Sequence, residues 1–344
     1  KIRTSYGVTG NMPKPFAKYT AMAPSNIGGI SGLVTSGLKG LDDIEPEEMA
    51  ELEYGVDGSV MNGLLGFEFT LYSQTITGLL LEVEEAPSTG YTTKWANSGD
   101  METNGMELDL VLNPVRTKSM NWVSRLSYYT TESKITALNV DPYNTGGFAT
   151  FLGAYRIEEG LSPHTMVGSE MTDGVHDVLG NETPDYIMGL NNRLQFGPFS
   201  VVAHIDIKEG GDIINLQKLI SDLGGTTYDY DSETLDLDGD GTKSGNGNER
   251  LTVLGGVTAP YIEDGSYIRL SEVSLNYDVP KSMLGGMVSS MQLGISARDW
   301  WISTDYSGWN PDVSQFGNVA VGGSVDTGPY PMSKALYFNI SVGL

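Results

Sequence analysis

Residues 186–208 read YIMGLNNRLQFGPFSVVAHIDIK, two alternating runs on either side of Gly197-Pro198. Within each run, apolar and polar side chains alternate with a period of two, which predicts a β-strand with one apolar and one polar face. The Gly-Pro pair is a turn signal and leaves little room for a longer connection. The stretch therefore predicts a hairpin of two long β-strands.

The same alternation recurs along the whole chain and predicts ten strands of about ten residues each. The clearest further runs are 106–113 and 336–344, and the first ten residues also fit a strand. Weaker runs cover 52–60, 65–73, 122–128 and 291–297. In 267–277 the alternation changes phase, which predicts a β-bulge near Ser271–Glu272.

The polar faces of these strands carry full charges, at Glu68, Glu107, Asp109, Arg193, Asp206, Lys208 and Arg298. A sheet with one face in water would explain them, but the connections favour a transmembrane barrel. Short turns at Asn62-Gly63, Pro114–Ser119, Gly197-Pro198 and Pro280–Ser290 alternate with connections of roughly 20 to 55 residues, a pattern typical of outer-membrane barrels. In a barrel, one apolar set should face lipid: Leu108, Leu110, Leu190, Leu194, Val201, Ile205, Phe338 and Ile340.

The amino-acid composition excludes several classes of partner and cofactor. The 344 residues contain 44 acidic and 20 basic side chains, a net charge of −24 that excludes nucleic acid as a partner. There is no cysteine and there are only three histidines, so thiolate metal sites and iron–sulfur clusters are excluded and no cofactor is required. No nucleophile elbow, phosphate loop or catalytic triad is present, and we expect no enzyme.

Five segments, in order, resemble the SusC/RagA-type TonB-linked outer-membrane transporters of Bacteroidota. They are KIRTSYGVTGN (1–11), TGY (89–91) with NSGDMETNGMEL (97–108), DGSYIRLSEVSLNYDVP (264–280), YSGWNPDVS (306–314) and YPMSKALYFNISVGL (330–344). The chain departs from the family pattern at Asn310-Pro311-Asp312, where Asp-Pro-Glu is usual.

The resemblance implies an all-β fold in which residues 1–344 form the C-terminal ten or so strands of a roughly 22-stranded barrel. Long loops would face outward, and the C-terminus would lie in the periplasm. The plug and N-terminal domains are expected outside this chain, and contact with the TonB complex would run through that plug. Other implied partners are a SusD-like surface lipoprotein, outer-membrane lipid, and a glycan or oligopeptide substrate.

One loop motif suggests a metal site. Asp236, Asp238, Asp240 and Thr242 lie at the spacing that begins a calcium-binding loop, with glycines between them. Gly247 occupies the position where a bidentate glutamate is expected, and Glu249 would replace it. The alternative is a solvated acidic loop tip, which the following SGNGN (244–248) favours because glycine-rich segments are mobile.

Aromatic residues gather where the strand 291–297 enters the last long loop. Trp300 and Trp301 fit the aromatic belt at a membrane interface. Trp309 lies further into the loop and would either belong to the same belt or, together with Tyr306, offer flat faces on which sugar rings stack.

Two other functional classes compete with import. A structural or adhesive outer-membrane barrel would bind surface partners through its acidic loops. A secreted, soluble β-sandwich lectin would bury the apolar stripe in a core.

Overall fold

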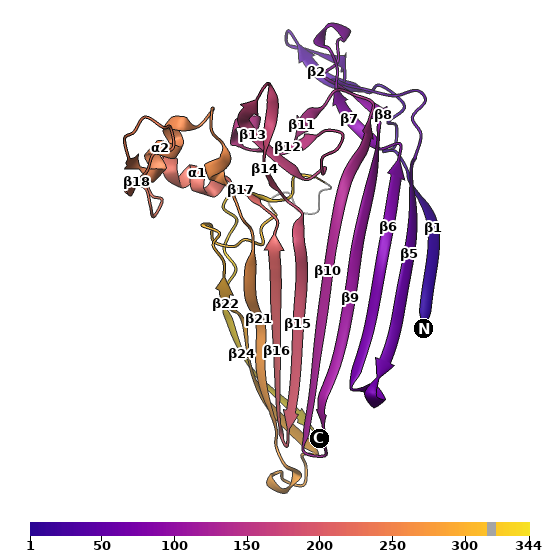
Figure 1. The fold of residues 1–344 in the computed structure, drawn as a ribbon, viewed down its shortest axis with the longest axis vertical. Helices are drawn as coiled ribbons and strands as arrows, with labels where there is room; N and C mark the ends of the chain where they lie inside the picture. Colours follow the sequence, from indigo (N-terminus) through magenta and orange to yellow (C-terminus); the bar gives the residue numbers. More distant parts are fainter. Residues whose placement is uncertain (315–320) are drawn as a thin grey trace.

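The computed structural model describes residues 1–314 and 321–344 of the chain. Its main element is a single sheet of ten strands in which each strand is antiparallel to its neighbours. The order is sequential, and the strands are β1 (Ile2–Asn11), β5 (Glu47–Val60), β6 (Leu65–Thr77), β9 (Gly99–Arg116), β10 (Met120–Leu138), β15 (Pro184–Phe196), β16 (Phe199–Gly210), β21 (Tyr267–Asp278), β22 (Ser290–Ser303) and β24 (Ala335–Gly343). The ten predicted strands are confirmed (Figure 1).

The register places apolar and charged side chains on opposite faces of this sheet. Leu126 lies between Leu110 and Leu190, whereas its neighbour Ser127 lies between Asp109 and Gly189. Because side chains alternate along a strand, these two rows point to opposite sides. The eight residues predicted to face lipid all share the face of Leu126.

The predicted bulge lies where expected. His204 pairs with Glu272 and Ile205 with Leu270, so Ser271 is the extra residue on β21. Its hydroxyl donates to the carboxylate of Asp206 on β16. The bulge keeps the apolar residues on both sides of the phase change on one face.

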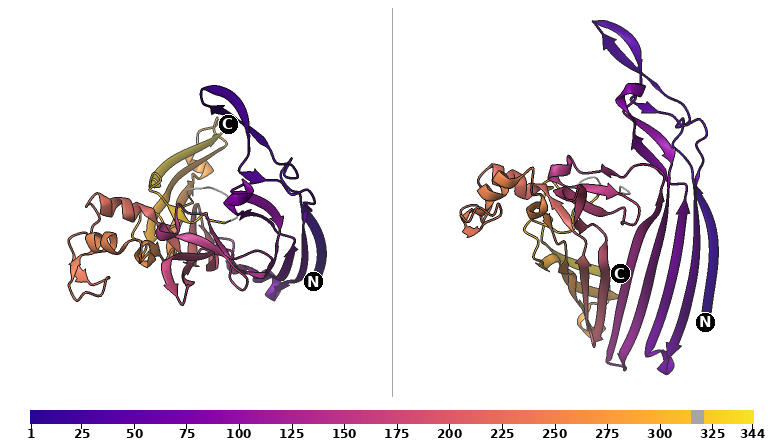
Figure 2. Two further views of the ribbon diagram at one scale, coloured as in Figure 1. Left: turned by 90° about the horizontal axis from the view of Figure 1, so that it is seen from above. Right: turned by 45° about the horizontal axis from the view of Figure 1, so that its top comes forward.

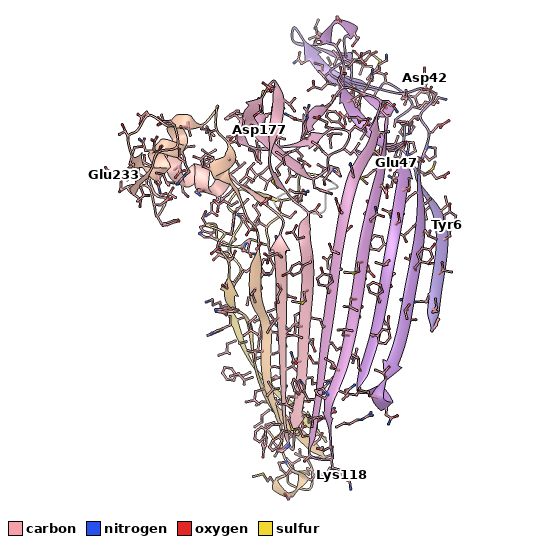
Figure 3. All side chains as sticks on the ribbon, viewed as in Figure 1. Tyr6, Asp42, Glu47, Lys118, Asp177 and Glu233 are labelled. Atoms are coloured by element: carbon pink, nitrogen blue, oxygen red, sulfur yellow. The ribbon has the colours of Figure 1, made fainter. Side chains whose placement is uncertain are left out.

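Long and short connections lie at opposite ends of the sheet (Figure 1). The short ones are residues 61–64, 117–119, 197–198 and 279–289, and the long ones are 12–46, 78–98, 139–183, 211–266 and 304–334. Figure 3 shows Lys118 at the short-turn end and Asp42, Asp177 and Glu233 among the long loops. The predicted alternation of long and short connections is confirmed.

Viewed from above, the ten strands follow an arc that does not close on itself (Figure 2). β1 and β24 lie at its two ends, each hydrogen-bonded to one neighbour among the described strands. The apolar face is uncovered, with Phe338 75% and Ile340 68% exposed. A soluble sandwich would bury this stripe, so the lectin alternative is wrong. None of the helices in the described ranges is long and apolar enough to span a bilayer.

The long loops fold into small sheets and helices of their own. These are the hairpin β2 (Met22–Ile27) and β3 (Ile30–Thr35); the sheet β4 (Leu38–Lys39), β8 (Thr93–Asn97) and β7 (Leu80–Glu84); the sheet β11 (Tyr143–Thr145), β12 (Ala154–Ile157), β13 (Thr165–Thr172) and β14 (Val175–Asn181); the sheet β20 (Ile262–Glu263), β17 (Ile213–Asn215) and β23 (Val325–Asp326); the pair β18 (Glu233–Leu235) and β19 (Ser244–Gly245); and the helices α1 (Leu216–Leu223) and α2 (Asn246–Val253).

The hydrophobic core lies in these loops rather than against the ten-stranded sheet. Its buried members come from three different long connections: Tyr155, Met166, Ile214, Leu216, Leu219, Tyr261 and Val325. β17 and β23 pair in parallel across this core, joining Ile214 to Val325. Parts of the connections 139–183, 211–266 and 304–334 therefore pack together into one layer at the long-loop end of the sheet.

Candidate functional site

Trp309 lies at the junction of three cavities beside the loop core. The cavities measure 130, 200 and 120 Å³, and among the described residues only Trp309 lines all three. The indole is 59% exposed, and three further exposed aromatic residues each share a cavity with it, Tyr228 (85%), Tyr330 (91%) and Trp301 (50%). Four exposed rings around adjoining cavities offer flat apolar surface to a ligand.

Polar groups from α1 complete the first two of these cavities. Gln217 lines both, and its buried Oε1 has no hydrogen-bond partner among the described residues. Lys218 lines the first, with its Nζ 2.9 Å from Oε1 of Glu263. An unpaired carbonyl oxygen at a cavity wall is an acceptor available to a ligand hydroxyl or amide.

Tyr306 occupies a different position from Trp309. It is 5% exposed, and its hydroxyl donates to Oδ2 of Asp326 at 2.6 Å. Burial raises its pKa, and the hydrogen bond to Asp326 adds to the rise. No ring face is open to a sugar, so this side chain holds the loop that carries Trp309.

The loop after Trp309 is tied to the end of the barrel sheet. Arg269 on β21 donates from Nη2 to Oδ1 of Asn310 at 2.7 Å and from Nη1 to Oδ2 of Asp312 at 3.1 Å. Charge-assisted contacts of this kind fix a loop strongly when the arginine is buried, and Arg269 is 7% exposed. The Asn-Pro-Asp segment therefore positions Trp309 above the lumen-facing side of β21.

The acidic motif forms a cluster of three carboxylates. The ligand oxygens of Asp236, Asp238 and Glu249 all lie within 4.8 Å of one another, and this group could hold a metal ion. Glu249 is 3% exposed, and its Oε2 is buried without a hydrogen-bond partner among the described residues. Its Oε1 accepts a hydrogen bond from the backbone N–H of Leu237.

Asp240, one of the predicted metal ligands, lies outside this group of carboxylates. It accepts a hydrogen bond from the backbone N–H of Thr242 at 2.6 Å. Residues 246–248 of the glycine-rich segment begin α2 rather than a mobile tip. Gly247 packs against Asp222 and Tyr230 where a Cβ atom would lie within 3.0 Å of both, so only glycine fits there.

A buried ion pair network joins the two helices behind the acidic cluster. Arg250 of α2 donates to both oxygens of Asp222 on α1, at 2.9 and 2.8 Å, and to both oxygens of Asp229. Arg250 and Asp222 are 3% and 1% exposed, and Tyr261 donates to Asp222 at 3.0 Å. The hydrogen bonds from Arg250 lower the pKa of Asp229.

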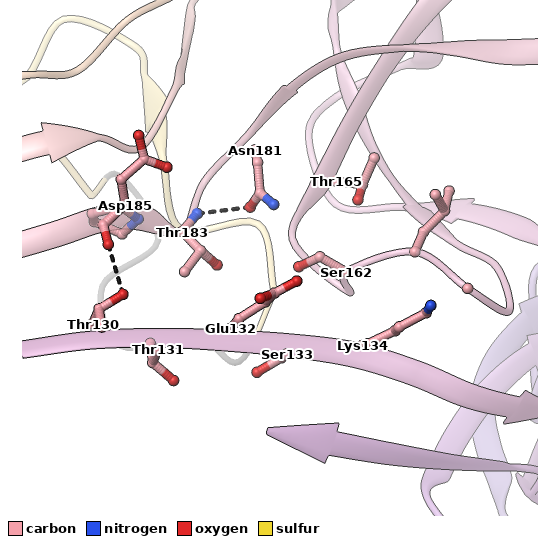
Figure 4. Close-up of a pocket in the computed structure, with 13 residues that line it drawn as sticks. Thr130, Thr131, Glu132, Ser133, Lys134, Ser162, Thr165, Asn181, Thr183 and Asp185 are labelled. Atoms are coloured by element: carbon pink, nitrogen blue, oxygen red, sulfur yellow. Dashed lines mark hydrogen bonds between the residues drawn. The ribbon is translucent and has the colours of Figure 1, made fainter. Parts of the chain in front are cut away.

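A larger polar cavity, which sequence reasoning missed, lies between the upper end of β10 and the loop that follows it. It measures 470 Å³ and is lined mainly by hydroxyl, amide and charged side chains, including Glu132, Lys134 and Asp185 (Figure 4). Thr130 donates to the backbone oxygen of Asp185 at 2.7 Å at one end. In the sequence, the polar run TTESK (130–134) was the signal that could have indicated this cavity.

This cavity also marks the outer limit of the apolar face. Along β10 the residues on that face are Trp122, Ser124, Leu126, Tyr128, Thr130, Glu132 and Lys134, so the apolar character ends after Tyr128. Tyr128 stacks on Tyr186 with ring centroids 5.5 Å apart. An aromatic pair at such a change is typical of a membrane interface. Trp300 and Trp301, 49% and 50% exposed at the end of β22, fit the same role.

Comparison with known proteins gives a consistent result. The family described as "TonB dependent receptor-like, beta-barrel" matches residues 1–298. TonB-dependent receptors P26 and P3 of Formosa agariphila are 26% and 24% identical, and each match covers 99% of this chain and 39% of the relative. The chain thus spans about two fifths of the length of these relatives.

Solved structures show the same fold. The RagAB peptide transporter matches with a TM-score of 0.74 at 19% identity, covering 99% of this chain and 40% of that chain. The RagAB peptide importer in its "open-open" state gives a TM-score of 0.72, also at 19% identity. The fold expected from the sequence is therefore confirmed.

Proposed function

Because the chain belongs to the TonB-dependent receptor-like β-barrel family of outer-membrane receptors, we propose that its full-length protein imports a glycan or oligopeptide. Membership of a family of transporters also confirms the expectation that the protein is not an enzyme. The observation that carries the proposal is the two-faced sheet, with an exposed apolar face and a charged opposite face under a packed layer of loops. Such a wall separates lipid from a wet lumen.

In this proposal, residues 1–344 are the C-terminal part of the barrel, and strands from the rest of the protein complete it. β1 and β24 each have one edge without a partner among the described strands, which supports this arrangement because an open sheet edge is not tolerated in lipid. A plug gated by the TonB complex would close the lumen. The short turns would face the periplasm and the long loops the cell exterior, where a SusD-like lipoprotein would cover them.

The substrate would be captured at Trp309. The aromatic rings around the three cavities suit sugar rings or apolar peptide side chains. The Oε1 of Gln217, unpaired among the described residues, suits the hydroxyl or amide groups of either. We also propose calcium as the ion for the acidic cluster, because three carboxylates are hard oxygen ligands on an outward-facing loop.

A genetic experiment tests the import proposal. Deleting the gene for the full-length protein should abolish growth on one class of oligosaccharide or peptide supplied as sole nutrient, and a TonB-deficient strain should show the same loss. Wild-type growth on every such nutrient, with loss of attachment to surfaces instead, would favour the adhesive alternative.

Trp309→Ala should weaken capture without affecting assembly. Loss of a central aromatic contact is expected to raise the half-saturating substrate concentration for uptake roughly tenfold. Trp300→Ala is the matched control, because Trp300 is similarly exposed but lines none of the three cavities. Equal uptake by the two variants at limiting substrate would remove Trp309 from the site.

A further inference from the structure

The acidic cluster and the first two Trp309 cavities share one loop. Both include residues of 211–266, the connection between β16 and β21. The cluster lies between the 236–238 turn and α2, whereas α1 and residues 226–228 form one wall of the first cavity. The opposite wall is residues 307–309.

A continuous series of polar contacts joins the cluster to that wall. Glu249 of the cluster precedes Arg250, which binds Asp222 and Asp229 on either side of residues 226–228. Thr227 lines the cavity, and its hydroxyl donates a hydrogen bond to Oδ1 of Asp222. The position of α2 therefore sets the position of the turn that presents Tyr228 to Trp309.

The cluster concentrates negative charge at one place. Three carboxylate oxygens within 4.8 Å of one another repel, and Glu249 also has a buried Oε2 that is unpaired among the described residues. Moving the exposed 236–238 turn away from α2 relieves the repulsion. A bound divalent cation reverses it and draws the turn onto α2.

Resting on the calcium and capture sites of the proposed function, we propose that one Ca²⁺ bound by Asp236, Asp238 and Glu249 orders the Tyr228 wall and so controls substrate capture at Trp309. Backbone oxygen and water would complete the coordination shell, since Asp240 lies outside the group of three carboxylates. Calcium sites on extracellular modules bind at about 0.1–1 mM, so the loop would respond to calcium outside the cell.

Calcium binding is tested on the full-length protein in detergent by isothermal titration with CaCl₂. Asp238→Asn should weaken binding roughly tenfold or more, because it removes a ligand charge. Asp240→Asn is the matched control in the same turn and should bind like the wild type. Equal affinities for the two variants, or no calcium binding by the wild type, would overturn the site.

Hydrogen exchange then tests the coupling. Adding 5 mM CaCl₂ in place of EDTA (about fivefold above the upper end of the expected range) should slow exchange at residues 236–242 and also at 226–231. Asp238→Asn should lose both effects, and Asp240→Asn should keep both. Slower exchange at 236–242 alone would overturn the control of the Trp309 wall.

These measurements separate this inference from the import proposal. Binding and exchange are read on purified protein without substrate, whereas import is read as growth. If the calcium experiments fail while growth still depends on the protein, the calcium site and its coupling are overturned and the import proposal stands. Normal growth of the deletion strain on every nutrient, with calcium binding by the purified protein intact, would overturn only the import proposal.

Discussion

Removal of residues 335–344 from the full-length protein is expected to abolish barrel assembly. β24 pairs with β22 along its length, and its other edge has no partner among the described strands. We propose that this edge pairs with a strand from outside the chain and closes the barrel. Without β24, the unpaired backbone groups of β22 would face lipid at a cost of several kcal/mol each.

The measurement is the amount of protein in purified outer membranes, together with its heat-modifiable migration on gels. Replacing the β2–β3 hairpin (residues 22–35) by a short glycine–serine linker is the control, because that hairpin lies in a loop. The control should accumulate normally and the truncation should be degraded. Normal accumulation of the truncated protein would show that β24 is not the closing strand.

Leu126→Arg should destabilise the barrel, whereas Ser127→Arg should be tolerated. Leu126 lies in the apolar row with Leu110 and Leu190, two residues from Tyr128 at the interface. An arginine facing lipid costs about 2–4 kcal/mol at the bilayer midplane and about 0–1 kcal/mol at the interface, so a cost on the order of 1–2 kcal/mol is expected at Leu126. Ser127 is its neighbour on the opposite face and pairs with Asp109, which would attract the guanidinium.

The comparison is made by urea unfolding of the full-length protein in lipid vesicles. The Leu126→Arg midpoint should fall clearly below that of the wild type, and the Ser127→Arg midpoint should stay close to it. The reverse order would mean that the apolar row faces the lumen.

The strands were predictable because their determinants are local. Alternation of the kind seen in residues 199–208 specifies both strand and face within a few residues, and the Ser271 bulge was visible as a change of phase. Turn residues such as Asn62 and Gly63, both with positive φ, marked the short ends.

The loop layer was not predictable in the same way. Its core joins Tyr155, Ile214 and Val325, which are distant in sequence and carry no periodic pattern. The cavities around Trp309 depend on Gln217 and Tyr228 from another connection, and Tyr306 becomes buried because Asp326 lies beside it. Glu249 could be proposed as a ligand, but its burial depends on where α2 begins.

The central claim is that one face of the ten-stranded sheet contacts lipid and the other lines a wet lumen. Residues 1–344 contain no cysteine, so single cysteines can be placed at each position from 187 to 196 of β15 in the full-length protein and spin-labelled in vesicles. Labels at 188, 190, 192, 194 and 196 should collide mainly with oxygen, which concentrates in lipid, and labels at 187, 189, 191, 193 and 195 with a water-soluble nickel chelate. If every label along the strand collided equally with the two reagents, or if the two sets of positions exchanged their preferences, the result would contradict the account.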